Sequence, residues 1–392
     1  MKEEKQNKDM GPAEKRPAEQ EVRPAEQESP GKAEKEKRTR EGRMAADRTE
    51  WRRAENRRLR LLAYLLLALA LAGEALVRLW PAAADAYGSY AYPVLVSCLA
   101  RLANLVPFSL VEVGLYAVLS FFLAALLRRV PFSCLLSVCI FFVGILSLTY
   151  VWNCGINYYR TPFSAYLQLE VRERDREELL DLVEYLTERV NETAHALEEE
   201  SSWRQTGQKA MERLGETYPQ LSGYYPLPKP LLISRILSVQ QLCGVYSPFT
   251  IEANYNREMP PYNIPHTICH ELSHLRGFMR EDEANFIGYL GCIGSGDPDY
   301  IYSGYLTGWV YAGNALAGQD REAYRRLYES LSAQARADLA YNNAFWESFE
   351  GKAAEVQEKM NDTYLKINAQ EDGVKSYGRM VDLMLAYYAS DL

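Results

Sequence analysis

Three apolar runs occupy the first half of the chain, and each is long enough to cross a membrane as a helix. They cover about Leu59 to Trp80, about Leu105 to Leu127 and about Val130 to Trp152. A helix needs about 20 apolar residues to span the hydrocarbon core, where its backbone groups must bond one another. We therefore expect a membrane domain of three transmembrane helices over residues 59–153.

The segment before the first run has a different composition. Residues 1–58 are rich in Lys, Arg, Glu, Pro and Ala, and so little of this segment can be buried that it predicts a disordered tail. Seven arginines lie between Arg43 and Arg60, at the end of this segment and the start of the first run, and Arg128 and Arg129 form the turn between the second and third runs. Since cytoplasmic loops are enriched in Lys and Arg, both regions are expected in the cytoplasm. Three crossings then place residues 154–392 outside it.

Charged residues inside the runs are few. Glu74 and Arg78 are one helical turn apart, which allows an ion pair near the membrane edge. Glu112 in the second run is either a functional group or a polar contact between packed helices, and the sequence leaves both open. So few polar groups argue against a transporter or channel. The connection 81–104 would be external, with its apolar part on or partly in the membrane.

The charge of the whole chain and its cysteines exclude other classes. A formal net charge of −8 argues against a nucleic-acid-binding protein. The seven cysteines show no C-x-x-C spacing and predict no disulfide framework. Cys269 points away from the direction of its neighbour His270 on a helix and is interpreted as buried packing.

The pattern H-E-x-x-H at His270, Glu271 and His274 concentrates the metal-ligand chemistry of the chain. On a helix, two histidines four residues apart lie on one face and can bind one metal ion, most naturally Zn²⁺. Glu271 is set off from the ligand direction and can take a proton from a metal-bound water. Asn263 and Pro265 supply a helix start before the pattern, and Gly277 is placed to end the helix.

A third ligand requires that break. In an unbroken helix, Glu281 would lie about 16 Å along the axis from His270. A short turn led by Gly277 would let a second helix begin near Glu281 and fold back, as in two-helix hairpins. Glu281 would then reach the metal, and Asn285, one turn further on the same face, could hydrogen-bond a ligand. Glu283 is the rival ligand, but no comparable partner lies four residues after it.

Two other residues near the pattern are unsuitable as ligands. His266 would lie about 12 Å from His274 along the helix, so these two and His270 cannot share an ion. The spacing also resembles the metzincin pattern, but its third ligand position holds Arg280, which stays protonated.

Elsewhere in residues 154–392 the sequence predicts mainly helices. Residues 171–200 carry leucines at helical spacing, with His195 at a polar, solvent-exposed end. Residues 244–254 predict an edge strand, where a peptidase substrate could pair; a plain core strand is the alternative. Residues 301–316 favour a buried helix over a fourth span. Near the end, a loop and then a helix are expected, and Tyr377 or Arg379 there could hydrogen-bond a developing oxyanion.

Two blocks carry a family resemblance: H-E-L-S-H-L-R-G-F-M-R-E-D-E-A-N over 270–285 and D-G-V-K-S-Y-G-R-M-V over 372–381. With three preceding spans, the chain from about residue 60 resembles the uncharacterised bacterial membrane family known as domain-of-unknown-function family 3810. The first block is also similar to gluzincin peptidases. That similarity implies His270, His274 and Glu281 as zinc ligands, Glu271 as base and Asn285 as a partner of a ligand. The gap between His274 and Glu281 is shorter than in gluzincins.

The expected fold is mainly α: three N-terminal transmembrane helices followed, over residues 154–392, by an α+β zincin-like domain with a small edge sheet and an active-site helix. The expected function is that of a zinc metallopeptidase, anchored in the bacterial cell membrane, with the bilayer and a peptide or protein substrate as its partners. The alternative is a membrane sensor or scaffold that binds metal without turnover. Glu271 favours the enzyme, because a structural zinc site needs no base.

Overall fold

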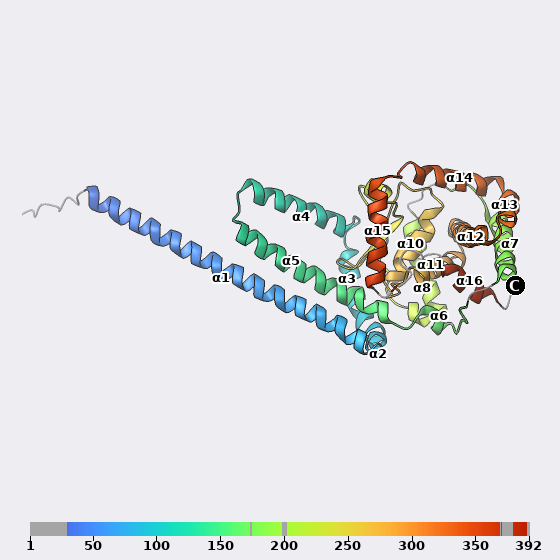
Figure 1. The fold of residues 1–392 in the computed structure, drawn as a ribbon, viewed down its shortest axis with the longest axis horizontal. Helices are drawn as coiled ribbons and strands as arrows, with labels where there is room; N and C mark the ends of the chain where they lie inside the picture. The colour runs from blue at the N-terminus through green and yellow to red at the C-terminus, as the bar shows by residue number, and fades with distance from the viewer. Residues whose placement is uncertain (1–29, 173–174, 198–201, 369, 371–378, 390–392) are drawn as a thin grey trace, which may run out of the picture. The chain divides into compact units, whose positions relative to one another are not determined.

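The computed structural model describes residues 30–172, 175–197, 202–368, 370 and 379–389 (Figure 1). The chain divides into two compact units, Met1–Glu55 and Asn56–Leu392. The described part of the first unit is the beginning of a long helix, and every other element lies in the second unit.

Helix α1 covers Pro30–Leu79 and so begins far upstream of the first apolar run. Residues 30–58 are helical where the sequence predicted a disordered tail, while residues 1–29 lie outside the described part of the chain. The physical reason is that Ala, Glu, Lys and Arg have high helix propensity. A segment rich in them can form a solvent-exposed helix even though it cannot form a hydrophobic core. Pairs one turn apart add to this, such as Arg38 and Glu34 at 2.9 Å.

Among the residues that the structure describes, three helices are long and apolar enough to cross a membrane by length and composition, as predicted: Lys37–Leu79 within α1, α4 (Leu110–Leu127) and the helical stretch Phe132–Tyr159. The last consists of α5 (Phe132–Asn153) and the short helix η2 (Gly155–Tyr159). Helix α4 starts five residues later than its apolar run because the Ser109 side chain caps it at the Glu112 amide. Arg129 lies in the turn between α4 and α5 with a φ of 51°.

The connection between the first two spans is helical, with α2 (Ala82–Ala86), η1 (Tyr87–Ala91) and α3 (Tyr92–Ala103). One side of α3 packs into the core of the C-terminal part of the chain through Tyr92, Val96 and Ala100.

The charged side chains within the candidate spans form ion pairs and hydrogen bonds with other parts of the structure. Arg78 donates to Glu74 at 2.7 Å, and the buried Glu112 accepts backbone amides of residues 232 and 233 at 2.6 and 2.9 Å. Glu112 is thus a polar contact between elements.

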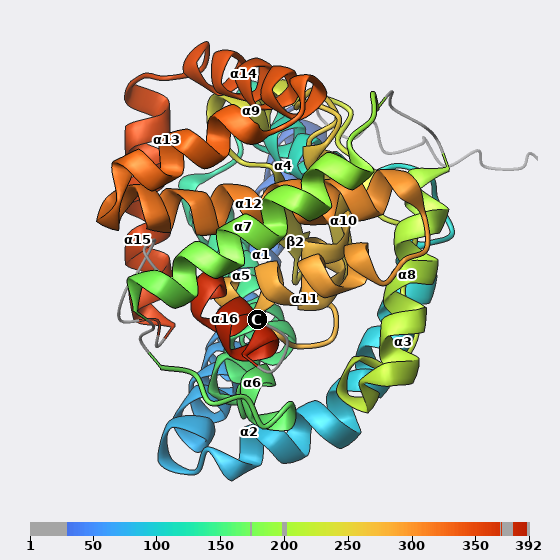
Figure 2. The same ribbon diagram turned by 90° about the vertical axis from the view of Figure 1, so that its right-hand side faces the viewer.

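The C-terminal part is built of helices around a small sheet (Figure 2). Its helices are α6 (Phe163–Tyr166), α7 (Arg176–Thr193), α8 (Trp203–Thr217), η3 (Pro219–Leu221), α9 (Arg235–Val239), α10 (Asn263–His274), α11 (Glu281–Ile293), α12 (Pro298–Gln319), α13 (Arg321–Ser330), α14 (Ala333–Glu347), α15 (Lys352–Ile367) and α16 (Met380–Tyr388). The core helix α10 packs against α8, α11 and α12, and α12 in turn lies beside α7.

The sheet has three short strands in the order β1-β3-β2: β1 (Lys229–Pro230), β2 (Gly244–Ser247) and β3 (Glu252–Tyr255). Strand β1 pairs with β3 in parallel, and β2 pairs with β3 as an antiparallel hairpin. The segment 244–254 is therefore two strands rather than one. Phe249 and Ile251, whose alternation suggested a single strand, lie in the turn between them. Strand β2 is at an edge, and it lies against α10.

Helix α12 is a buried helix of the C-terminal part and is not a candidate span, as the sequence predicted for residues 301–316. Its aromatic and glycine content allows close packing: Tyr300, Tyr302 and Trp309 are nearly inaccessible to solvent. Helix α7 begins at a capping box formed by Asp175 and Glu178 and buries its leucines against α12. These packed helices hold α10 and α11 in place.

Candidate metal centre

The helix break after the H-E-x-x-H pattern is present as predicted. Helix α10 ends at His274, the chain turns, and α11 begins at Glu281. Gly277 lies in the turn with a φ of 83°, a left-handed conformation that glycine adopts without steric cost. A Cβ atom at this position would stand 2.4 Å from Nη1 of Arg160. The turn lets α11 fold back along α10, and the two helices pack closely.

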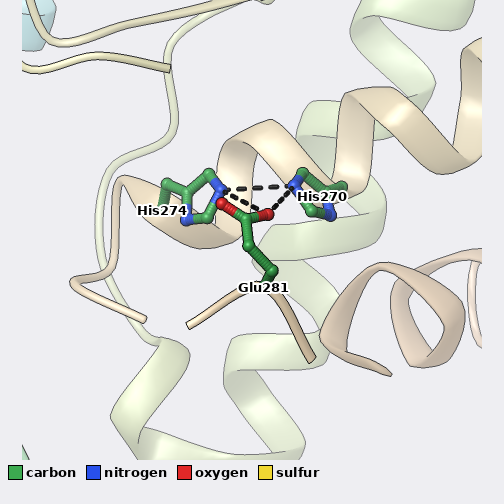
Figure 3. A group of neighbouring side chains, drawn as sticks. All are labelled: His270, His274 and Glu281. Carbon is green, nitrogen blue, oxygen red and sulfur yellow. Dashed lines mark hydrogen bonds and ion pairs between the residues drawn. The ribbon is translucent and has the colours of Figure 1, made fainter. Parts of the chain in front are cut away.

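The fold-back brings Glu281 to the two histidines, as Figure 3 shows. Nε2 of His270 and Nε2 of His274 are 3.2 Å apart. Oε2 of Glu281 lies 3.2 Å from Nε2 of His270 and 3.9 Å from Nε2 of His274. All three side chains converge on one point from two helices.

Hydrogen bonds on the far side of each ring determine which nitrogen faces the centre. Nδ1 of His270 is 2.8 Å from Oδ1 of Asn285, and Nδ1 of His274 is 2.8 Å from the backbone oxygen of Phe278. Both oxygens can only accept, so each Nδ1 carries the ring proton and donates it. Each Nε2 therefore presents a lone pair to the centre. Asn285 holds His270 in this tautomer, the role expected for a partner of a metal ligand.

Burial favours the neutral form of both rings. Desolvation lowers the pKa of His270 and that of His274 to about 4, so the two imidazoles are uncharged near neutral pH. Two neutral lone pairs and a carboxylate at these distances repel one another unless a cation lies between them.

The donor set fits Zn²⁺. Zinc ligands at about 2.0–2.1 Å in tetrahedral geometry stand about 3.3 Å from one another. Two of the three separations in the cluster are 3.2 Å, and the third is 3.9 Å. Two imidazoles and one carboxylate are also a ligand set that leaves a fourth position for water or substrate, as in catalytic rather than structural zinc sites.

Glu271 lies beside the cluster, against the edge strand β2. Its Oε1 would be only 2.5 Å from a Cβ added at Gly244, so the absence of a side chain at Gly244 permits this close approach. Burial raises the pKa of Glu271 well above its usual value, the Glu281 carboxylate raises it further, and a hydrogen bond from the Tyr246 backbone opposes both. Glu271 is not one of the three converging groups.

A cavity of about 1040 Å³ opens over the cluster. His270, Glu271, His274 and Glu281 line it, together with residues of α15. A cavity of this volume can hold a peptide segment or a small-molecule ligand at the upper end of the usual size range. No sequence pattern indicated that α15 lines this site, because its contact with the cavity depends on the path of the chain far from the H-E-x-x-H pattern.

The rejected ligand candidates lie elsewhere. Glu283 points away and accepts the Phe163 amide at 2.9 Å, with Arg280 at 3.7 Å. His266 donates from Nε2 to the backbone oxygen of Asn285 at 3.1 Å. Among the candidates, then, the geometry brings Glu281 and not Glu283 to the histidines.

The expected oxyanion donors are not seen at the centre. Tyr377 lies outside the described residues. Arg379 precedes α16, approaches Asp382 at 3.9 Å and does not line the cavity. A tyrosine that sequence reasoning missed, Tyr311 of α12, does line it and lies near Asn285 and Glu281. Nothing in the local sequence distinguishes Tyr311 from the other aromatic residues of α12.

The fold and this centre define a mainly helical protein with three candidate membrane spans and a buried His–His–Glu cluster beside a glutamate. A family model described as "Protein of unknown function (DUF3810)" matches residues 87–385. The chain belongs to this family. The match begins after the first span, whereas the sequence resemblance was expected from about residue 60. Comparison with curated proteins and with solved structures gives no match.

Proposed function

We propose that this protein is a membrane-anchored, zinc-dependent peptidase whose active site is the cluster of His270, His274 and Glu281. The observation that carries the proposal is the convergence of the two Nε2 atoms and Oε2 of Glu281 beside the separate carboxylate of Glu271. A structural zinc site would need no such neighbour and would usually fill its fourth position with a protein side chain.

A zinc ion held by the cluster would polarise the scissile carbonyl and acidify a water molecule. Glu271 would accept the proton that the attacking water loses and pass it to the leaving nitrogen. The C–N bond then breaks, giving one new carboxyl and one new amino terminus. Asn285 keeps the His270 ring in its ligand tautomer, and Tyr311, which lines the cavity near Glu281, would hydrogen-bond the carbonyl oxygen.

Strand β2 supports the peptidase proposal over other hydrolases. It is at the edge of the sheet, and its Tyr246 amide faces Glu271 rather than β3. An extended peptide could add to this edge through backbone hydrogen bonds, with its scissile bond near Glu271. A helix with H-E-x-x-H beside an edge strand is the arrangement expected of a zincin-like domain.

The proposed location is the bacterial cell membrane, with the C-terminal domain outside the cytoplasm. The arginine-rich stretch before the first span and the pair Arg128 and Arg129 support the cytoplasmic placement of that side. The helices α4 and α5 meet at that pair, at their ends remote from the C-terminal domain.

The test uses the full chain in lipid nanodiscs, loaded with zinc and given an unstructured protein. The wild type is expected to bind zinc in equimolar amount and to cleave the protein. Glu271→Gln should keep the zinc and lose at least about 100-fold in kcat/KM, since it removes a general base and no ligand. Glu283→Gln is the matched control, because its amide can still accept the Phe163 amide proton.

The outcomes separate the two candidate functions. Equimolar zinc with no cleavage by the wild type would reject the peptidase and leave the metal-binding sensor or scaffold. Loss of zinc from Glu283→Gln but not from Glu281→Gln would reject the ligand set itself.

A further inference from the structure

Two exposed apolar surfaces flank the cavity, and both are held at the level where the membrane spans end. The first comprises Leu232, Ile233 and Ile236, at and just before α9, with 60%, 48% and 39% of each residue exposed. The second comprises Val356, Met360 and Ile367 of α15, which are 56%, 63% and 64% exposed. Large exposed apolar side chains are rarely clustered in this way on the surface of a soluble protein.

The depth of the first surface is set by hydrogen bonds to a span. The backbone amides of Leu232 and Ile233 donate to Glu112 at 2.6 and 2.9 Å. Glu112 is in the first turn of α4, the second candidate span. Leu232 and Ile233 therefore lie beside the first turn of a candidate membrane helix, which would place them at the depth of the lipid headgroups or just below them.

The depth of the second surface is set at the end of α15. The Ile367 carbonyl lies 3.5 Å from Nη2 of Arg78, in the last turn of the first span. The next residue, Asn368, accepts a hydrogen bond from Tyr150 of α5 at 2.7 Å. From there α15 runs crosswise to α4 and α5 (Figure 1). It thus lies along the plane in which the spans end.

The residue pattern of α15 suits that position. At about 100° per residue, Val356, Met360 and Ile367 fall within about 40° of one another on the helix. Lys352, Lys359 and Lys366 form an exposed row along the margin of this apolar stripe. Apolar side chains flanked by lysines are typical of helices in the bilayer interface, where the ammonium groups reach lipid phosphates.

The other side of the same helix faces the metal centre. Ala354, Glu358 and Asn361 of α15 line the cavity, each at least about 100° around the helix from every residue of the apolar stripe. On the first surface, α9 leads directly into Gln240 and Gln241, which also line the cavity. The cavity is therefore bounded by two elements that each expose apolar side chains at the level of the span ends.

We propose that these two surfaces enter the outer part of the bilayer and make the cavity open along the membrane surface. The substrate class that follows rests on the proposed peptidase function. The substrate would be the membrane-proximal segment of another membrane-anchored protein, cut by the same hydrolysis. A freely soluble peptide would lack the local concentration that a shared membrane provides.

The membrane contact is tested without reference to activity. The full chain is reconstituted in phosphatidylcholine–phosphatidylglycerol vesicles that contain a lipid with a photoreactive diazirine in its acyl chain. After illumination, labelled peptides are identified by mass spectrometry. We expect label in the peptides with Ile236 and Met360 at the level found around Leu119 of α4, which is 59% exposed within a span. Helix α13, on the side of the domain away from α4 and α5, is the background control.

Label around Ile236 and Met360 no higher than in α13 would overturn the proposal. With a diazirine-bearing amino acid in place of Ile236 or Met360, concentration-dependent cross-links to a second copy of the chain would also overturn it and would identify a chain–chain interface instead.

The substrate class is tested with one peptide in two forms, lipid-anchored and free, in the same vesicles. Ile236→Glu and Met360→Glu should each lower kcat/KM for the anchored form about tenfold, because a charge opposes insertion, and leave cleavage of the free form unchanged. Equal loss on both forms would reject the proposed substrate class. Cleavage of neither form by the wild type would reject the peptidase, and the photolabelling would still decide the membrane contact.

Discussion

Asn285 shows how much of the candidate metal centre depends on a residue outside the proposed ligand set. Its Oδ1 accepts the proton of Nδ1 of His270, so that Nε2 is left with the lone pair that faces Glu281 and His274. The sequence predicts this role because Asn285 follows Glu281 by one helical turn on the same face. The backbone oxygen of Phe278, which does the same for His274, could not be predicted, because its position depends on the conformation of the turn after α10.

His195 is a residue where sequence reasoning expected only exposure. Its Nε2 lies 2.7 Å from Oδ1 of Asp299, and Oδ2 of Asp299 also accepts a hydrogen bond from Trp203 at 2.6 Å. Burial alone would lower the pKa of His195, but the Thr193 carbonyl and the Asp299 carboxylate together raise it. Protonated His195 therefore ties the end of α7 to the start of α12.

A histidine whose pKa is raised on folding stabilises the protein below its unfolded-state pKa of about 6.5, and this contribution is lost as pH rises through the folded-state value. We expect His195→Gln to lower the Tm of the full chain in detergent at pH 5.5 and to lower it less at pH 8.5. Thermal unfolding of both proteins at the two pH values measures this. A decrease that is equal at both values, or larger at pH 8.5, would contradict a charge-dependent link.

The pair of helices α10 and α11 is the element whose prediction from sequence was most complete. A helix start at Asn263, a break at Gly277 and a second helix at Glu281 are local signals, and all three are present. The β2–β3 hairpin was predicted as one strand, because short apolar runs do not show where a chain reverses. The contact of α15 with the cavity joins positions about 100 residues apart, beyond the reach of any local pattern.

The turn at Gly277 gives a prediction for this pair of helices. Gly277→Ala is expected to destabilise the protein by about 1 kcal/mol or more, since its φ is 83° and the new Cβ would meet Arg160. It should also reduce bound zinc, because Glu281 follows the turn. Gly318→Ala in α12 is the control, as its Cβ would meet no atom within 4 Å. Wild-type Tm and zinc content in Gly277→Ala would show that the break tolerates a side chain.

At the scale of the whole molecule, hydropathy predicted the three spans well because a membrane helix must satisfy its backbone within itself. It did not predict the docking of the C-terminal part onto them. Lys229 and Glu252 form a buried ion pair at 2.6 Å, and Glu252 also accepts the first amides of α4, from Leu110 and Val111, at 3.0 and 3.1 Å. The spans and the C-terminal part are thereby joined through charged groups. A hydropathy profile records such groups only as low values and does not show their partners.

Because the two parts are joined, the orientation of the spans determines on which side of the membrane the candidate metal centre lies. The arginines before the first span and at the turn between α4 and α5 predict a cytoplasmic N-terminus and a C-terminal domain on the opposite side. An epitope tag at the C-terminus should therefore be detected on intact spheroplasts, and a tag at the N-terminus only after permeabilisation. A cytoplasmic protein of the same cells serves as the control for leakage. Detection of the N-terminal tag alone on intact spheroplasts would reverse the orientation and place the cavity over the cytoplasmic leaflet, where its substrates would have to be sought.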